Sequence, residues 1–211
     1  MHISDGVLSA PVWIGGYIVA AGIVAITTRK MDPQDMPKVA VLTSVFFVAS
    51  LIHVPLGPTS VHLLLNGLVG MILGSMAFVS ILVGLILQAI LFQHGGITTI
   101  GVNAVMMGIP ALLAYQIFNL RQRFHFRSNE VVFGALAGAT GVFLGTIILA
   151  MLLVTTGDEF IGVAKYAALA HLPVIIIEGI ITGFIASFLM KVKPEILGGE
   201  VIDIKSYHLN K

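Results

Sequence analysis

The sequence contains no cysteine and few charged residues. Among 211 residues, Asp, Glu, Lys and Arg together make up 10%. The lack of cysteine excludes disulfides, thiolate metal ligands and cysteine nucleophiles. Soluble domains carry about 25% charged residues, so this shortage, with a mean hydropathy of +1.03, indicates an integral membrane protein. The formal net charge of +1 carries no information about nucleic-acid binding. We expect no nucleic-acid partner.

Catalytic and nucleotide-binding motifs are also missing. The sequence has no G-x-x-x-x-G-K-[ST] loop, so the chain is not expected to hydrolyse ATP alone. It has neither an H-E-x-x-H helix nor a G-x-S-x-G elbow, which argues against an intramembrane protease. No basic region precedes the first apolar run and no small-residue cleavage site follows it. We therefore expect no cleavable signal peptide, a mature terminus at Met1, and a protein that is not an enzyme.

Apolar runs separated by short polar breaks predict one membrane domain over residues 1–211. A membrane span needs roughly 17–25 residues, and Pro- and Gly-containing breaks divide the runs. We predict an all-α membrane protein, a compact bundle of seven transmembrane helices, with a segment 1–10 before it and a tail 194–211 after it. The predicted spans are 11–28, 39–54, 60–74, 76–93, 100–118, 131–155 and 168–191, with breaks at Pro55-Leu-Gly57-Pro58, Gly74-Ser75, Gly95-Gly96 and Gly157-Asp158.

The basic residues predict the orientation of the bundle. With seven spans, only Lys165 falls on one side, and positive residues stay cytoplasmic. The amino terminus is therefore expected outside and the tail 194–211 in the cytoplasm of a cell whose membrane the chain crosses several times. The residues on the predicted cytoplasmic side are Arg29, Lys30, Lys38, Arg121, Arg123, Arg127, Lys191, Lys193, Lys205 and Lys211.

The first two residues are suited to chelate a metal ion. The α-amine of Met1, the deprotonated amide of His2 and Nδ1 of His2 can close a five- and a six-membered ring, which leaves one in-plane position of a square-planar ion open. Such coordination suits Cu(II) or Ni(II) and can accommodate Co(II). Because ligands must lose protons to bind, we expect the metal affinity to fall with acidification.

Most of the histidines fall at the predicted outer ends of the helices. His53 and His62 flank the rigid Pro/Gly turn, which can hold an imidazole at the fourth position of the ion. A single histidine near a membrane end is more often bonded to a carbonyl, so this alternative stays open for each one. The five outer histidines are His2, His53, His62, His94 and His171.

Other polar residues near these histidines allow two interpretations. Thr98, Thr99 and Asn103 follow His94 and could orient metal ligands, but capping of the next helix is favoured for the threonines. Glu178 lies two helical turns after His171 and could carry protons, pair with His171 or anchor packing. Glycine pairs such as Gly70 and Gly74 would let helices approach closely.

Four stretches resemble the CbiM/NikM family, the cobalt and nickel substrate-capture (S) subunits of energy-coupling-factor transporters. Length and number of spans also fit, so the resemblance covers nearly the whole chain. The sequence departs from some members at Ser4, where proline is frequent, and at His53, where many have no histidine. The stretches are MHISDG (1–6), GPTSVHLLLNGLVG (57–70), HGGITTIGVNAVMMGIPALLAY (94–115) and AHLPV (170–174).

The resemblance implies a metal site and a set of partners. The amino terminus would thread into the bundle, and the ion would bind the Met1 amine, the His2 amide and imidazole, and His62. Partners would be a transmembrane coupling subunit, two cytoplasmic ATPases and, in some systems, a small accessory membrane subunit, within prokaryotic membrane lipid. Additional or supporting site residues would be His53, His94, Asp5, Ser60 and Asn103, with Asp5 orienting the inserted segment.

We therefore predict a membrane-embedded substrate-binding subunit for ATP-driven uptake of Ni(II) or Co(II), with no cofactor besides the transported ion. A self-sufficient secondary transporter, in which Glu178 carries protons against the metal, stays open as an alternative. An intramembrane metalloenzyme is disfavoured because catalytic metals keep a coordination position for water, whereas four nitrogens would fill the plane.

Overall fold

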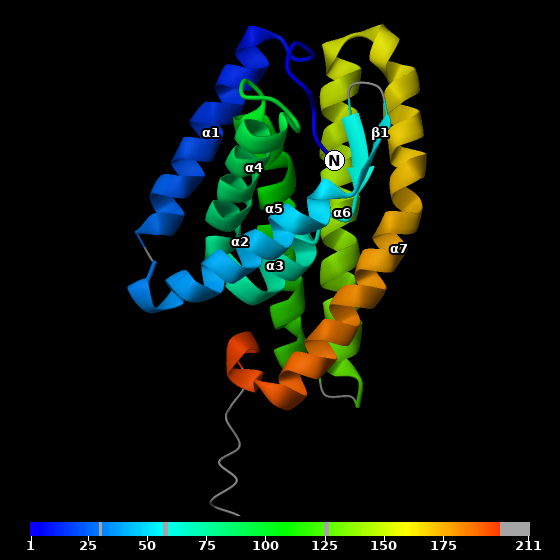
Figure 1. The fold of residues 1–211 in the computed structure, drawn as a ribbon. Coiled ribbons are helices and arrows are strands. Elements are labelled where there is room, and N and C mark those ends of the chain that lie inside the picture. The colour runs from blue at the N-terminus through cyan, green and yellow to red at the C-terminus, as the bar shows by residue number, and fades with distance from the viewer. Residues whose placement is uncertain (30, 57–58, 125–126, 199–211) are drawn as a thin grey trace, which may run out of the picture.

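In the computed structural model, the chain forms a helical bundle with one short β-hairpin (Figure 1). The structure describes residues 1–29, 31–56, 59–124 and 127–198. Expectations for Lys30, Gly57, Pro58 and residues 199–211 of the predicted tail lie outside this part. The helices are α1 (Ala10–Thr28), α2 (Met36–Leu51), α3 (Asn66–Leu73), α4 (Ala77–Phe92), α5 (Ile100–Asn119), α6 (Asn129–Thr156) and α7 (Ile161–Val192).

A β-hairpin and five short 3-10 turns connect these helices. Strand β1 (His53–Leu56) pairs antiparallel with β2 (Thr59–His62), and His53 lies directly opposite His62. Figure 1 shows α6 and α7 running along each other beside the hairpin, with α1 at the other edge of the bundle. The turns are η1 (Pro33–Asp35), η2 (Gly74–Met76), η3 (Leu120–Arg123), η4 (Asp158–Phe160) and η5 (Pro194–Leu197).

Five helical stretches of the described chain are long and apolar enough to cross a membrane. Helix α3 has eight residues and rises only about 12 Å at about 1.5 Å per residue, whereas a bilayer core is about 30 Å thick. The number of spans and the side that each terminus faces therefore stay predictions. The five stretches are Ala10–Thr28, Asn66–Phe92, Ile100–Arg123, Asn129–Thr156 and Asp158–Val192.

The predicted helix over 60–74 is wrong in its first part. Residues 59–62 form β2, where β-branched Thr59 and Val61 alternate with Ser60 and His62, a pattern that suits a strand, and helix begins only at Asn66. The end of the predicted helix 39–54 is wrong for the same reason, because α2 stops at Leu51 and β1 follows. The predicted break at Gly74 is confirmed: its φ of 58° is a backbone conformation that favours glycine.

Helix α3 lies in the middle of the bundle, and all eight of its residues are buried. A Cβ atom on Gly70 would lie 2.0 Å from the carbonyl oxygen of Ala111 in α5. One on Gly67 would lie 2.6 Å from the carbonyl oxygen of Ala137 in α6. Glycine thus lets α3 touch the backbones of two neighbours at once, as expected for Gly70 from its spacing.

The amino-terminal segment lies inside the bundle. Figure 1 marks the terminus beside the hairpin and α6, and Met1 and Ile3 are fully buried. The Met1 side chain occupies space left by a glycine of α6, because a Cβ on Gly145 would lie 3.1 Å from Met1 Sδ. The chain therefore places its first residues between β2 and the long helices.

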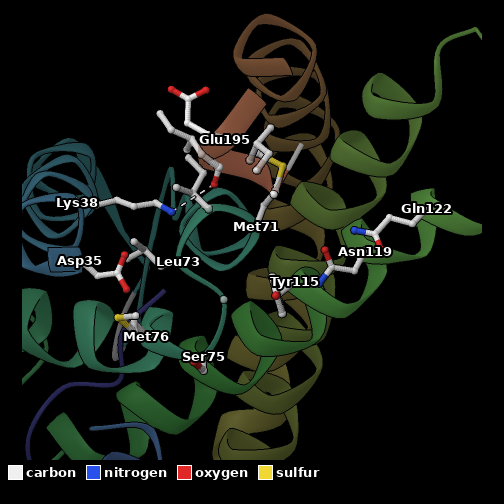
Figure 2. Close-up of a pocket in the computed structure, with 15 residues that line it drawn as sticks. Asp35, Lys38, Met71, Leu73, Ser75, Met76, Tyr115, Asn119, Gln122 and Glu195 are labelled. Atoms are coloured by element: carbon white, nitrogen blue, oxygen red, sulfur yellow. Dashed lines mark hydrogen bonds between the residues drawn. The ribbon is translucent and has the colours of Figure 1, made fainter. Parts of the chain in front are cut away.

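A separate cavity of about 500 Å³ lies where α7 ends (Figure 2). Two basic side chains bind the backbone of η5 beside this cavity. Lys38 Nζ donates to the Ile196 carbonyl at 3.3 Å, and Arg121 Nη2 donates to the Leu197 carbonyl at 2.5 Å. None of the described residues that line this cavity is a histidine. It is therefore not the predicted metal site.

We expect Gly70→Ala to destabilise the protein, because the new methyl group would collide with the α5 backbone. Overpacking of this kind costs about 1–3 kcal/mol. The matched control is Gly22→Ala in α1, where no atom lies within 4 Å of the new Cβ and alanine should gain about 0.5–1 kcal/mol. Thermal unfolding of the detergent-solubilised protein measures both, and equal midpoints for the two variants would contradict the close packing of α3.

Candidate metal site

Three histidines from distant parts of the chain lie together beside the amino terminus. His2 belongs to the segment before α1, His62 ends β2, and His94 follows α4. One ligand atom of each lies within 4.8 Å of those of the other two. His2 is 2% exposed and His62 is 4% exposed. The structure thus brings together His2 and His62, both predicted to bind metal, and His94, which is predicted as an additional or supporting site residue.

A chain of hydrogen bonds fixes the tautomer of His2. Ser50 Oγ donates to the Phe47 carbonyl at 2.7 Å, so it accepts from Gln88 Nε2 at 2.5 Å. The Gln88 amide oxygen then faces Nε2 of His2 at 2.7 Å. Because this oxygen can only accept, His2 carries its proton on Nε2 and presents a lone pair on Nδ1.

His62 is held in the complementary tautomer. Its Nδ1 lies 2.7 Å from the carbonyl oxygen of Leu63 and must donate, which leaves a lone pair on Nε2. His62 Nε2 faces His2 Nδ1 at 3.0 Å. Two nitrogen lone pairs therefore point at each other in a buried place, an arrangement that calls for a positive charge between them.

The separation of these nitrogens suits a shared metal ion. Metal–imidazole bonds are about 2.0–2.1 Å long, so two ligands at right angles on one ion lie about 2.8–3.0 Å apart by the same bond length. The observed 3.0 Å between His2 Nδ1 and His62 Nε2 matches adjacent positions of a square plane. A carbonyl and an amide oxygen bound to the outer nitrogens orient both rings, as partners of metal-binding histidines do.

Burial keeps the candidate ligands uncharged. Desolvation lowers the pKa of the Met1 amine well below 8.0, although the nearby Glu178 carboxylate acts in the opposite direction. Desolvation, and then the positive charge of the terminus, lowers the pKa of His2 and of His62 well below 6.5. Burial and the neighbouring His53 lower the pKa of His94 to about 4. At neutral pH the three histidines are therefore in the deprotonated form that binds metal, and burial of the Met1 amine favours its neutral form as well.

Asn103 of α5 holds the backbone of the amino-terminal segment. Its Oδ1 accepts the Ile3 N–H at 3.0 Å, and its Nδ2 donates to the Ile3 carbonyl at 3.1 Å. Thr99 Oγ1 donates to the same carbonyl at 2.7 Å. Asn103 and Thr99 therefore fix the residue next to His2 without reaching the histidine nitrogens themselves.

Asp5 fastens the same segment to the loop between α4 and α5. Its carboxylate accepts the backbone N–H groups of Ile97 at 3.1 Å and Thr98 at 2.9 Å, as well as the Thr98 hydroxyl. Thr99 stands at the N-cap position of α5, but its side chain makes no capping hydrogen bond to the helix, so the interpretation of Thr99 as a side-chain cap is wrong. Both hydroxyls bind the inserted segment instead: Thr98 Oγ1 donates to the exposed carboxylate of Asp5, and Thr99 Oγ1 donates to the Ile3 carbonyl.

His53 and Ser60 lie next to the cluster. The exposed His53 ring has its centroid 4.2 Å from that of His94, and its Nδ1 lies 3.2 Å from the Leu51 carbonyl oxygen. Ser60 is buried and lines a small cavity together with His2 and His94. Neither residue approaches the facing nitrogens of His2 and His62 through any contact found in the described chain.

Gln88 is a site residue that the motifs do not reveal. It is fully buried in α4 and binds His2. The sequence feature that could have pointed to Gln88 is its single amide side chain in the apolar run 77–92, because a buried polar group requires a hydrogen-bond partner.

Glu178 and His171 do not form the suggested pair. Glu178 Oε1 accepts the backbone N–H groups of Leu64 and Leu65, the latter at 2.9 Å, just before α3 begins. A carboxylate at this end of a helix is stabilised by the helix dipole. His171 Nδ1 lies 2.7 Å from the Ala167 carbonyl oxygen, and no hydrogen bond or ion pair found in the described residues joins it to Glu178. Glu178 thus anchors helix packing, one of the three roles considered for it.

Comparison with known proteins identifies the family. A family model described as "CbiM: Cobalt uptake substrate-specific transmembrane region" matches residues 2–196. The chain belongs to the CbiM family. CbiM membership confirms a multi-pass membrane protein of a prokaryotic metal-uptake family, a transporter component and not an enzyme.

Relatives of this CbiM chain span most of its length. A "Putative metal transport protein" of Haemophilus influenzae is 34% identical over 199 residues, which covers 93% of this chain and 97% of that protein. A "Putative fused cobalt transport protein CbiMQ" of Methanocorpusculum labreanum is 29% identical over 93% of this chain but only 36% of its own length. A crystal structure of a transition metal transporter aligns over 100% of both chains with a TM-score of 0.83 and 25% identity.

We expect the metal-free protein to lose stability on acidification. The pKa values of the three clustered imidazoles lie below 6.5, their usual value, so the unfolded chain takes up protons first as the pH falls. Stability is therefore full above about pH 6.5 and declines toward about pH 4, the pKa of His94. Unfolding midpoints of chelator-treated protein measure this, and His62→Gln should flatten the dependence. A midpoint that rises between about pH 7 and pH 5 would contradict neutral burial.

Proposed function

We propose that this protein is the substrate-binding membrane subunit of an ATP-driven transporter of the energy-coupling-factor type, and that it takes up Ni(II) or Co(II). The observation that carries the proposal is the 3.0 Å approach of His2 Nδ1 to His62 Nε2, with both lone pairs turned inward. Membership in a cobalt-uptake family supports a transition metal as the missing charge between them.

The proposed site is a plane of four nitrogens. With Met1 as a free terminus, its amine and the His2 amide and Nδ1 occupy three positions, and His62 Nε2 takes the fourth. In such a chelate the amide nitrogen lies between the amine and Nδ1, so the fourth ligand is adjacent to Nδ1, in agreement with the 3.0 Å separation. The lowered pKa of the buried Met1 amine favours its use as a ligand at neutral pH.

Two ions are suitable probes of this site. Four nitrogens in a plane suit Ni(II) by geometry, whereas the family description names cobalt. The transported ion is the substrate, and the proposal includes no other cofactor.

Partners would supply the energy for uptake. The sequence carries no phosphate-binding loop of its own, and one relative is a "Putative fused cobalt transport protein CbiMQ" of which this chain covers 36%. We propose that a separate transmembrane coupling subunit takes the place of that additional region and that two cytoplasmic ATPases drive release. Glu178 Oε1 accepts two backbone N–H groups in front of α3, which supports a structural role for this residue over a proton-carrying one.

The chelate is tested by two changes that leave most of the bundle intact. We expect an alanine inserted between Met1 and His2, and separately His62→Ala, to abolish tight Ni(II) binding measured by calorimetry. Square-planar Ni(II) is diamagnetic, so the loaded wild type should show no paramagnetic NMR shifts. The matched control is His171→Ala, which also removes a fully buried imidazole but lies outside the cluster. Undiminished binding by the insertion variant would refute a chelate through the terminus.

Dependence on partners distinguishes the two transport classes. We expect proteoliposomes with this chain alone to bind ⁶³Ni(II) or ⁵⁷Co(II) without accumulating it, because the chain lacks an energy source. Accumulation driven by a proton gradient in the absence of partners, and lost in Glu178→Gln, would instead establish the secondary transporter.

A further inference from the structure

A small polar cavity leads to the histidine cluster. It has a volume of about 120 Å³, enough for a few water molecules. Hairpin residues and the connection after α4 line it, and His2 lies on its wall. Three of its polar atoms are buried without a hydrogen-bond partner in the described chain, namely Thr59 Oγ1, Ser60 Oγ and His94 Nε2. Because such groups are costly unless they are bonded, this wall suits a hydrated, polar occupant.

Four imidazoles form a row from the surface to the buried nitrogens. The ring centroids of His53 and His94 are 4.2 Å apart, and those of His94 and His2 are 4.1 Å apart. The row ends at His62, whose centroid is 4.9 Å from that of His2. Exposure decreases along it, since His53 is exposed, His94 is partly exposed, and His2 and His62 are buried.

The two outer rings have ligand atoms to spare. The Nδ1 atom of His53 lies 3.2 Å from the Leu51 carbonyl oxygen, so the ring carries its proton there and Nε2 keeps its lone pair. His94 Nε2 has no partner in the described chain. Both side chains line the cavity, and neutral imidazole is the commonest protein ligand for metal ions.

We propose that His53 and His94 form an access site that binds a divalent transition-metal ion in this cavity and passes it to His2 and His62. The inference rests on the proposed function. Four nitrogens already fill the plane at the inner site, so His94 has no in-plane position there, and its unpartnered nitrogen lines the path to it. The ion exchanges water for imidazole in steps, while the Thr59 and Ser60 hydroxyls bind its remaining waters. Successive ring centroids lie 4.1 to 4.9 Å apart, so each imidazole is close to the next one along the row.

Binding kinetics test the access site in the full chain. Stopped-flow measurements follow Ni(II) and Co(II) association with the wild type, His53→Ala and His94→Ala, and chelator-induced dissociation follows release. The matched control is Val54→Ala, which changes the neighbouring, exposed residue of β1 that does not line the cavity. A binding site on the access path lowers the barrier to metal association and to metal dissociation by the same amount, so it speeds both. We therefore expect each histidine variant to lower both rate constants about tenfold, equivalent to about 1.4 kcal/mol of barrier, with the dissociation constant unchanged and Val54→Ala silent.

Other outcomes overturn the access site in distinguishable ways. Unchanged association in both histidine variants would mean that the ion reaches the inner site by another route. Faster dissociation and weaker affinity in His94→Ala, at an unchanged association rate, would make His94 a ligand of the finally bound ion. A wild type that binds neither Ni(II) nor Co(II) would refute the proposed function itself.

Discussion

The two hydrogen bonds between Asn103 and the backbone of Ile3 determine where the amino terminus lies, and the candidate site depends on that position. A chain end is polar and is costly to bury without partners. Asn103 satisfies both the N–H and the carbonyl of Ile3, and Asp5 ties the following residues to the loop before α5. Met1 and His2 are thereby held next to β2. Without these hydrogen bonds, we expect such a short, non-helical segment to remain at the surface.

The helices orient the imidazole rings of His2 and His62 as well as burying them. Ser50 of α2 and Gln88 of α4 transmit a fixed donor–acceptor direction to the ring of His2, so the polar groups of two apolar helices decide which nitrogen faces inward. Glu178 of α7 fixes the backbone just after β2, and α3 holds its place by glycine contacts with α5 and α6. The position of His62 thus depends on residues from several helices, few of which touch it.

Composition and motifs predict the membrane class and several helix ends, because both depend on the local sequence. The shortage of charge gives the membrane class, and the breaks at Gly74 and Gly95 locate helix ends correctly. The hairpin was missed because residues 53–62 fit either a helix end or a strand until the pairing of His53 with His62 is known. Thr98 and Thr99 match a capping pattern, and only the presence of Asp5 and Ile3 beside them reveals another role. Gln88 was missed because one amide in an apolar helix does not show which distant group it meets.

The facing nitrogens of His2 and His62 belong to residues 60 positions apart, so an ion shared between them would act as a cross-link. Binding to the folded form alone stabilises it by about 4 kcal/mol at a thousandfold excess of ion over the dissociation constant. The same free energy opposes unloading, since every tenfold gain in affinity adds about 1.4 kcal/mol to the work of release. Efficient scavenging of a scarce ion therefore sets a minimum on the work that each transport cycle has to deliver.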